Sequence, residues 1–283
     1  MPQSEGFSRF PVRKVSNGKH IETTDTLAVE EPLEIRVGFR VGEVRRNSAV
    51  SITMRTPGDD FELASGFLFT EGIICSPEQI DHIKHCGPKN TEGATNTVRV
   101  DLSDGVRVDL KSLERHFYTT SSCGVCGKSS IEALYTGAKK IVPNGFRIKG
   151  GLINSLPERL RANQDVFERT GGLHASALFD GEGGLIEIRE DVGRHNALDK
   201  VIGARLMEGE TSLSETVLMV SGRASFELVQ KSLMAGIPLM LAVGPPSTLA
   251  VELANEFGMT LVGFVRDGGY NVYSGAGRVS GER

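Results

Sequence analysis

The chain has 283 residues, which is the length of one or two domains and enough to bury a sizeable hydrophobic core. It carries 32 lysines and arginines against 36 aspartates and glutamates, so its formal net charge is -4. This balance excludes nonspecific binding to duplex nucleic acid as its main function. No apolar run approaches the ~18 residues that cross a bilayer, and the N-terminus lacks the apolar core of a signal peptide. We therefore expect a cytoplasmic protein with no membrane attachment and with its four cysteines reduced.

The first third of the sequence predicts a small, hairpin-rich α+β domain covering residues 1–115. Its first signal is the pair Asn17-Gly18, which readily adopts the positive φ angles of a two-residue hairpin turn. Alternating apolar and polar residues predict strands, and apolar residues at helical spacing predict one helix. The expected elements are a hairpin of 11–15 with 20–24, a helix over 60–69, and strands over 33–39, 48–56, 97–102 and 105–110.

A second helix is expected after residues 76–79, which have the pattern of a helix start. That helix would place His82, His85 and Cys86 on one face, where they could bind a metal. An ordinary solvated face is the favoured alternative, because no second cluster supplies the remaining ligands of a closed site. Cys75 is expected to be buried and unreactive.

The last 110 residues alternate regularly between strand and helix patterns, within a C-terminal domain expected to cover residues 116–283. This alternation predicts a sheet with a parallel portion covered by helices. The expected strands are 173–179, 185–189, 216–220, 238–243 and a closing strand 260–265, and the expected helices are 196–207, 226–235 and 247–257. Ligands of such sheets bind beyond the carboxyl ends of the strands.

Basic, glycine-rich loops follow three of these strands. The loops contain Arg194-His195, Ser221-Gly222-Arg223 and Arg266-Asp267-Gly268-Gly269. Two of them lead into helix N-termini, whose free N–H groups and dipole favour an anion. This arrangement predicts a site for a phosphate-bearing ligand such as a nucleoside diphosphate. The alternative is that the three arginines form surface ion pairs with Glu190, Asp191 and Asp267.

Cys123 and Cys126 form a C-x-x-C motif among small polar residues and glycines, which predicts an exposed loop. Residues 129–132 have capping-box spacing, so a helix should begin directly after the motif. The helix dipole and the adjacent lysine should lower the pKa of a thiol there and make it reactive. Three chemistries stay open from the residues alone: a sulfur carrier, a zinc site that recruits His116 or His174, and thiol–disulfide exchange.

Several segments spread along the chain carry a family resemblance. They are S-C-G-V-C-G at 122–127, T-G-G-L-H-A at 170–175, D-V-G-R-H-N at 191–196, S-G-R-A-S-F at 221–226 and V-G-F-V-R at 262–266, together with M-R-T-P-G-D-D at 54–60. The chain resembles the formate dehydrogenase accessory sulfurtransferase family (FdhD) in all of them. The similarity runs from about residue 11 to the C-terminus.

The resemblance implies a sulfurtransferase that receives sulfur from a cysteine desulfurase as a persulfide. It would pass the sulfur to molybdenum held by two molybdopterin guanine dinucleotides, before that cofactor enters formate dehydrogenase. Cys123 would carry the persulfide, with Cys126 as a helper. The resemblance also implies a homodimer and an α/β fold like that of cytidine deaminase, a three-layer arrangement of sheet and helices.

The resemblance further implies where the cofactor binds. The family's segment for the guanine dinucleotide corresponds to Phe264, Val265, Arg266, Asp267, Gly268 and Gly269. It coincides with the loops described above, so Arg194, His195, Ser221, Gly222 and Arg223 are expected to complete the site. A GDP-like nucleotide should bind there as a mimic of the cofactor.

Two alternative functions are considered beside sulfur transfer. A zinc-dependent, deaminase-like hydrolase needs H-x-E at one helix start and P-C-x-x-C at the next. His195-Asn196-Ala197 and residues 221–225 lack these sets, and no Glu follows His174 at the required position, so hydrolysis is disfavoured and no resident metal is assigned. A cofactor-binding chaperone without thiol chemistry would keep the anion site and need neither cysteine.

Overall fold

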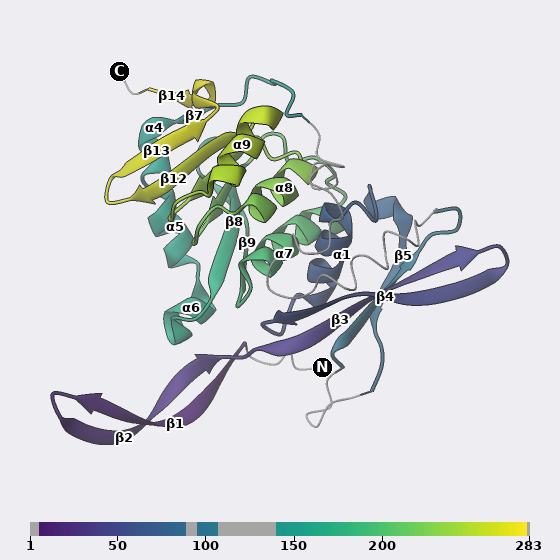
Figure 1. Ribbon diagram of the computed structural model, residues 1–283, viewed down its shortest axis with the longest axis horizontal. Helices are drawn as coiled ribbons and strands as arrows, with labels where there is room; N and C mark the ends of the chain where they lie inside the picture. The colour runs from purple at the N-terminus through teal and green to yellow at the C-terminus, as the bar shows by residue number, and fades with distance from the viewer. Residues whose placement is uncertain (1–5, 89–94, 107–139, 282–283) are drawn as a thin grey trace.

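The computed structural model describes residues 6–88, 95–106 and 140–281 of the chain. Its largest sheet has six strands in the order β13-β12-β11-β10-β8-β9 (Figure 1). The strands are β8 (His174–Phe179), β9 (Leu185–Asp191), β10 (Val217–Val220), β11 (Leu239–Ala242), β12 (Thr260–Arg266) and β13 (Gly269–Ser274). β10, β11 and β12 are parallel, and β8 runs antiparallel to both β10 and β9. β9 therefore points the same way as β10, β11 and β12, and these four strands end at one edge of the sheet.

Helices cover both faces of the six-stranded sheet. On one face lie α7 (Arg194–Met207), α8 (Phe226–Met234) and α9 (Thr248–Phe257), packed on strand residues such as Leu218 and Met240. On the other face, α4 (Gly150–Ile153) and α5 (Leu156–Ala162) pack against Met219 and Leu241. The expected sheet with a parallel portion and its covering helices is confirmed. The likeness to the cytidine deaminase fold stays a prediction.

Smaller elements complete the C-terminal part. They are α6 (Asp165–Thr170), a parallel pair of β7 (Ile148–Lys149) and β14 (Val279–Ser280), and a 3-10 turn η2 (Ala276–Arg278). β13 is an additional edge strand, so β12 does not close the sheet as the sequence suggested. No helix in the described ranges is long and apolar enough to cross a membrane.

The N-terminal part forms a second sheet of four strands in the order β4-β3-β6-β5. The strands are β3 (Glu31–Val41), β4 (Val44–Arg55), β5 (Ile80–His85) and β6 (Thr97–Leu102). Helix α1 (Asp60–Thr70) lies between this sheet and α7 (Figure 1). Side chains of both sheets and of α1 belong to one continuous hydrophobic cluster. The expected domain boundary between residues 115 and 116 falls outside the described residues and stays a prediction.

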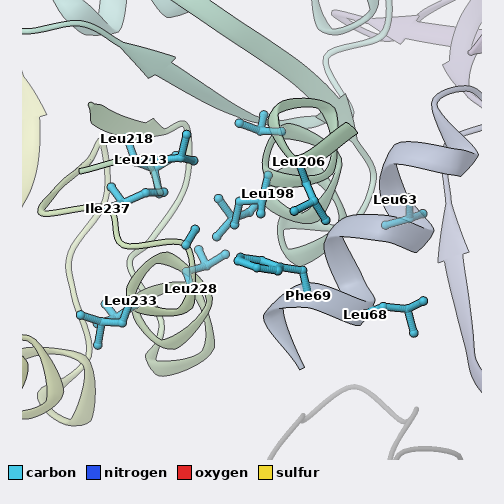
Figure 2. Packing of buried hydrophobic residues seen from close by; sticks show 14 of the residues in the cluster. Leu63, Leu68, Phe69, Leu198, Leu206, Leu213, Leu218, Leu228, Leu233 and Ile237 are labelled. Atoms are coloured by element: carbon cyan, nitrogen blue, oxygen red, sulfur yellow. The ribbon is translucent and has the colours of Figure 1, made fainter. Parts of the chain in front are cut away.

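Helices α1 and α7 touch through two glycines. A Cβ atom on Gly66 would lie 1.9 Å from the backbone oxygen of Asp199, and one on Gly203 would lie 1.9 Å from the backbone oxygen of Glu62. Only glycine fits at either position, because any side chain would overlap the facing backbone. In Figure 2, Phe69 of α1 extends toward the layer of α7 and α8.

The first hairpin is confirmed. β1 (Phe7–Ser16) and β2 (Lys19–Ala28) pair along their whole length, and Asn17 and Gly18 have φ angles of 49° and 76°, as their two-residue turn requires. This hairpin extends away from the rest of the structure at the lower left of Figure 1. The strand expected over 105–110 lies almost entirely outside the described residues.

Two expectations for residues 75–86 are wrong. Only a 3-10 turn, η1 (Pro77–Gln79), forms after residue 76, and the chain continues as β5 instead of a helix. β5 pairs with β6, so backbone hydrogen bonding to a distant strand outweighs the local helix-start pattern. His82 and His85 therefore point to opposite sides of a strand and cannot form the helical face considered for a metal. Cys75 is exposed instead of buried.

The contact between α1 and α7 predicts the effect of one methyl group. Gly203→Ala should lower the free energy of unfolding by about 3 kcal/mol, because the helix backbones must separate to admit it. Gly277→Ala is the control, since a Cβ there would meet no atom within 4 Å. Urea denaturation measures both variants, and an unchanged midpoint for Gly203→Ala would contradict the backbone contact.

Candidate functional site

The loops that the sequence assigned to an anion meet at the edge where β9 to β12 end. Backbone hydrogen bonds join the loops after β10 and β11 to each other and to the neighbouring strands. Ser221 N donates to Ala175 O (3.0 Å), Gly244 N donates to Gly222 O (2.9 Å), and Phe264 N donates to Gly244 O (3.2 Å). These bonds fix the loops after β10 and β11 against each other and against β8 and β12, because Ala175 and Phe264 lie within those two strands. We call this region the strand-end edge.

Glycines make this close approach of the loops feasible. A Cβ on Gly222 would lie 3.3 Å from His174 Nδ1, and one on Gly244 would lie 3.1 Å from Gly222 O. Both distances are tighter than most Cβ contacts in proteins. Ser221, in contrast, uses its side chain within the fold, because its Oγ accepts a hydrogen bond from Ala175 N (2.9 Å).

Arg194, the first residue of α7, lies close enough to two histidines to affect their charge. Burial first, and then the Arg194 guanidinium, lowers the pKa of His174, while Asp191 opposes the shift. Burial and Arg194 act in the same order on His195, and together with Lys231 they lower its pKa to about 4. Both imidazoles are therefore neutral at pH 7.

His195 also faces the start of α8. Its Nε2 lies 3.5 Å from Ser225 Oγ and 3.9 Å from Glu227 Oε2. Glu227 alone would favour the imidazolium, but burial and the neighbouring cations outweigh it. The contact between His195 and Glu227 is therefore not an ion pair at pH 7.

Arg266 stands at the end of β12, at the turn into β13. Asp267 and Gly268 form this two-residue turn with φ angles of 54° and 75°, and Phe264 has an unusual positive φ of 55° where the strand register shifts. The Arg266 guanidinium lies 5.5 Å from the Phe264 ring centroid. Its ion pair with Asp267 is 3.9 Å long and exposed, so it is weak and does not prevent binding of an anion.

The other carboxylates considered as partners of the arginines are bound elsewhere. Glu190 accepts hydrogen bonds from Val166 N and Phe167 N at the start of α6, each 2.9 Å long. Asp191 Oδ2 lies 2.9 Å from Lys200 Nζ. Of the surface ion pairs considered as the alternative, the structure contains the one between Arg266 and Asp267. Glu190 and Asp191 have other partners.

A buried polar cluster fixes the start of α7. Lys200 and Asp191 have side chains that are 1% and 0% exposed. Thr56 joins both of them, because its carbonyl accepts from Lys200 Nζ (3.0 Å) and its N–H donates to Asp191 Oδ2 (3.1 Å). Asp191 Oδ1 accepts from Gly193 N (2.8 Å) and from Asn196 Nδ2 (3.0 Å). The segments at 54–60 and 191–196 are thus parts of one cluster.

This cluster was not foreseen from the sequence. Lys200 lies in a predicted helix, where a lysine ordinarily faces solvent. The available signal was its position four residues after Asn196, which places both on one face of the helix. That spacing alone does not show that Lys200 is buried, because the burial depends on contact with the segment at 54–60.

The structure brings most of the predicted site residues to the strand-end edge. These are Arg194, His195, Ser221, Gly222, Arg223 and Phe264 to Gly269, with the side chain of Val265 buried in the sheet core. Cys123, Cys126 and His116 lie outside the described residues. Among the residues that are described, no three His, Cys, Asp or Glu side chains are placed to hold a metal ion.

Comparison with known proteins identifies the family of the chain. Residues 28–280 match the FdhD/NarQ family. The chain belongs to this family. It is similar to proteins named sulfur carrier protein FdhD, with 49% identity to that of Streptomyces coelicolor, covering 96% of this chain and 95% of the relative. The protein of that name from Saccharolobus solfataricus is 40% identical, covering 96% of this chain and 97% of the relative.

A solved structure shares the fold. It is described as a putative formate dehydrogenase accessory protein from Desulfotalea psychrophila, and it matches with a TM-score of 0.73 over 98% of this chain and 100% of that chain. The two sequences are 23% identical, so this likeness concerns the fold alone.

The buried cluster predicts a large effect of one substitution. Lys200→Met should lower the free energy of unfolding by about 3–5 kcal/mol, because it leaves the Asp191 carboxylate buried without its counter-charge. Lys149→Met, at an exposed position, is the control. Urea denaturation followed by circular dichroism gives the comparison, and equal midpoints for the two variants would contradict the role of Lys200.

Proposed function

We propose that the protein is a sulfurtransferase that accepts sulfur from a cysteine desulfurase and transfers it to the molybdenum bis(molybdopterin guanine dinucleotide) cofactor of formate dehydrogenase. The observation that carries the proposal is membership in the FdhD/NarQ family together with the C-x-x-C motif at 123–126. Relatives that cover nearly the whole chain bear the name sulfur carrier protein FdhD. The proposal includes action in the cytoplasm, a homodimer and the cytidine-deaminase-like form of the fold.

The proposed chemistry begins at Cys123. Its thiolate attacks the outer sulfur of the desulfurase persulfide, the sulfur–sulfur bond of the donor breaks, and the donor cysteine leaves as a thiolate. A new sulfur–sulfur bond now holds the transferred atom on Cys123, with Cys126 as a helper. The persulfide is a soft sulfur ligand suited to a transition metal such as molybdenum. Delivery would break this sulfur–sulfur bond, with its electron pair leaving on Cys123 as a thiolate. The outer sulfur would become a sulfide ligand by taking two electrons from the molybdenum of a reduced cofactor.

The strand-end edge is the proposed binding site for the nucleotide parts of the cofactor, which is the substrate that receives the sulfur. Arg194, Arg223 and Arg266 would bind the pyrophosphate groups through charge-assisted hydrogen bonds. The N-termini of α7 and α8 open at the same edge and add free N–H groups. The backbone of residues 264–269 would contact the guanine, and a GDP-like nucleotide would occupy the same place.

A cofactor-binding chaperone without thiol chemistry is the second candidate. The observation that favours it is that the described residues proposed to bind the anion at the strand-end edge include arginines and helix N-termini but no cysteine. The two candidates make the same prediction for nucleotide binding and opposite predictions for the thiols.

Substitution of the cysteines separates these candidates. Cys123→Ala should abolish persulfide formation on the chain by the desulfurase, measured by intact mass spectrometry, and should abolish activation of formate dehydrogenase. Cys75→Ala is the matched control, because Cys75 is exposed and lies outside the motif. Full activation by the double variant Cys123→Ala/Cys126→Ala would support the chaperone instead.

Nucleotide binding tests the strand-end edge. Arg266→Ala should weaken the affinity for GDP about tenfold, because the variant loses one charge-assisted hydrogen bond to the nucleotide. Arg46→Ala, an exposed arginine of the four-stranded sheet, should leave the affinity unchanged. Calorimetric titration measures both, and equal affinities for the two variants would move the nucleotide site away from Arg266.

A further inference from the structure

Two neutral histidines at the strand-end edge have no role in the thiol chemistry proposed above. His174 begins β8 and His195 is the second residue of α7, and both lie in the field of Arg194. A neutral imidazole beside a cation is a weak partner for an anion, yet both histidines stand where the diphosphate groups are proposed to bind. We therefore consider what happens to them when such a ligand arrives.

The surroundings of His174 confine its ring. In the pairing of β8 with β9 it lies opposite Asp191, and a Cβ on Gly222 would come within 3.3 Å of its Nδ1. The charged groups that act on it are Arg194 of α7 and Asp191 of β9. Because Asp191 is occupied by Lys200 at 2.9 Å, it cannot fully offset Arg194. His174 is thus half-buried next to an excess of positive charge.

His195 is half-buried and faces the start of α8. Its Nε2 faces Ser225 Oγ at 3.5 Å and Glu227 Oε2 at 3.9 Å. Lys231 and Glu71 also act on it, in opposite directions. Lys231 is itself held by Asp199 at 2.9 Å and by Glu71 at 3.3 Å. The protein around His195 therefore contains charges of both signs, and a new anion would change their balance.

We propose that binding of a diphosphate-bearing ligand at the strand-end edge is coupled to the uptake of protons by His174 and His195. This inference rests on the proposed function, because it requires the nucleotide to bind at this edge. The diphosphate places negative charge beside Arg194 and offsets the part of the lowered pKa of both rings that the guanidinium causes, which adds to the larger effect of burial. Each imidazolium then becomes a charged hydrogen-bond donor for the ligand.

The coupling has a definite sign. Each histidine has a lower pKa in the free protein than in the complex. At pH values between these two, binding of the ligand takes up a proton, so the affinity for the ligand falls as pH rises. The fall is at most about tenfold per pH unit for each histidine, since one proton is exchanged. For His195 this range begins near pH 4, the pKa it has without ligand. The ligand is therefore held more tightly in acid and released more readily as pH rises.

The test is calorimetric titration of the full chain with GDP-mannose at about pH 6, in two buffers that differ in ionisation enthalpy. GDP-mannose is suitable because both of its phosphates are diesters and do not titrate near this pH. The expected result is a buffer-dependent heat that shows proton uptake, reduced in His174→Gln and in His195→Gln. His82→Gln, an exposed histidine of β5, is the control and should retain the full uptake.

Three results would overturn the inference, and only the last of them would also contradict the proposed function. Binding of GDP-mannose without proton uptake would refute the coupling and leave the nucleotide site intact. Full uptake in the double variant His174→Gln/His195→Gln would assign the protons to other groups. No binding by the wild-type chain would contradict the nucleotide site of the proposed function as well. NMR titration of wild-type histidines with and without ligand gives an independent readout, in which two resonances should shift to higher pKa.

Discussion

The buried ion pair of Lys200 and Asp191 connects the C-terminal part of the structure to the N-terminal part, because Thr56 hydrogen-bonds to both side chains. It lies where Thr56 of the N-terminal part meets the end of β9 and the start of α7. A buried charge pair is stable only when its remaining donors and acceptors are also satisfied, and here Thr56, Gly193 and Asn196 satisfy them. Arg194 follows directly after Gly193, so the position of the first arginine of the strand-end edge depends on this cluster.

The direction of the strands then determines which loops can act together. β9 is separated from β10 in the sheet by the antiparallel β8, yet both end at the same edge, together with β11 and β12. Gly222 and Gly244 let the loops lie close enough to hydrogen-bond through their backbones. The result is a basic edge in which Arg194 and Arg266 come from opposite ends of the chain's alternating region, while partial burial keeps His174 and His195 neutral.

The limits of sequence-based prediction here have physical causes. Strands and helices over residues 173–265 were predictable because their apolar periodicity is local, and Asn17-Gly18 specified its turn for the same reason. Residues 80–85 were wrongly expected to be helical, because pairing with β6 is a long-range interaction that the local pattern does not contain. The meeting of Arg194, Gly222 and Arg266 at one edge was predictable from the alternation of strands and helices. The burial of Lys200 was not, because it depends on a segment about 140 residues earlier in the chain. Cys123 and Cys126 lie outside the described residues, so their role rests on the motif and the family.

Transfer of a labelled sulfur atom would test the central claim most directly. The chain would be charged with radioactive sulfur by a cysteine desulfurase, separated from the donor, and offered the molybdenum bis(molybdopterin guanine dinucleotide) cofactor. Sulfur carriage by Cys123 predicts that the label leaves the protein, appears on the cofactor and leaves a free thiol behind. Label that stays on the chain, or a Cys123 sulfur found bound to a zinc ion, would contradict it.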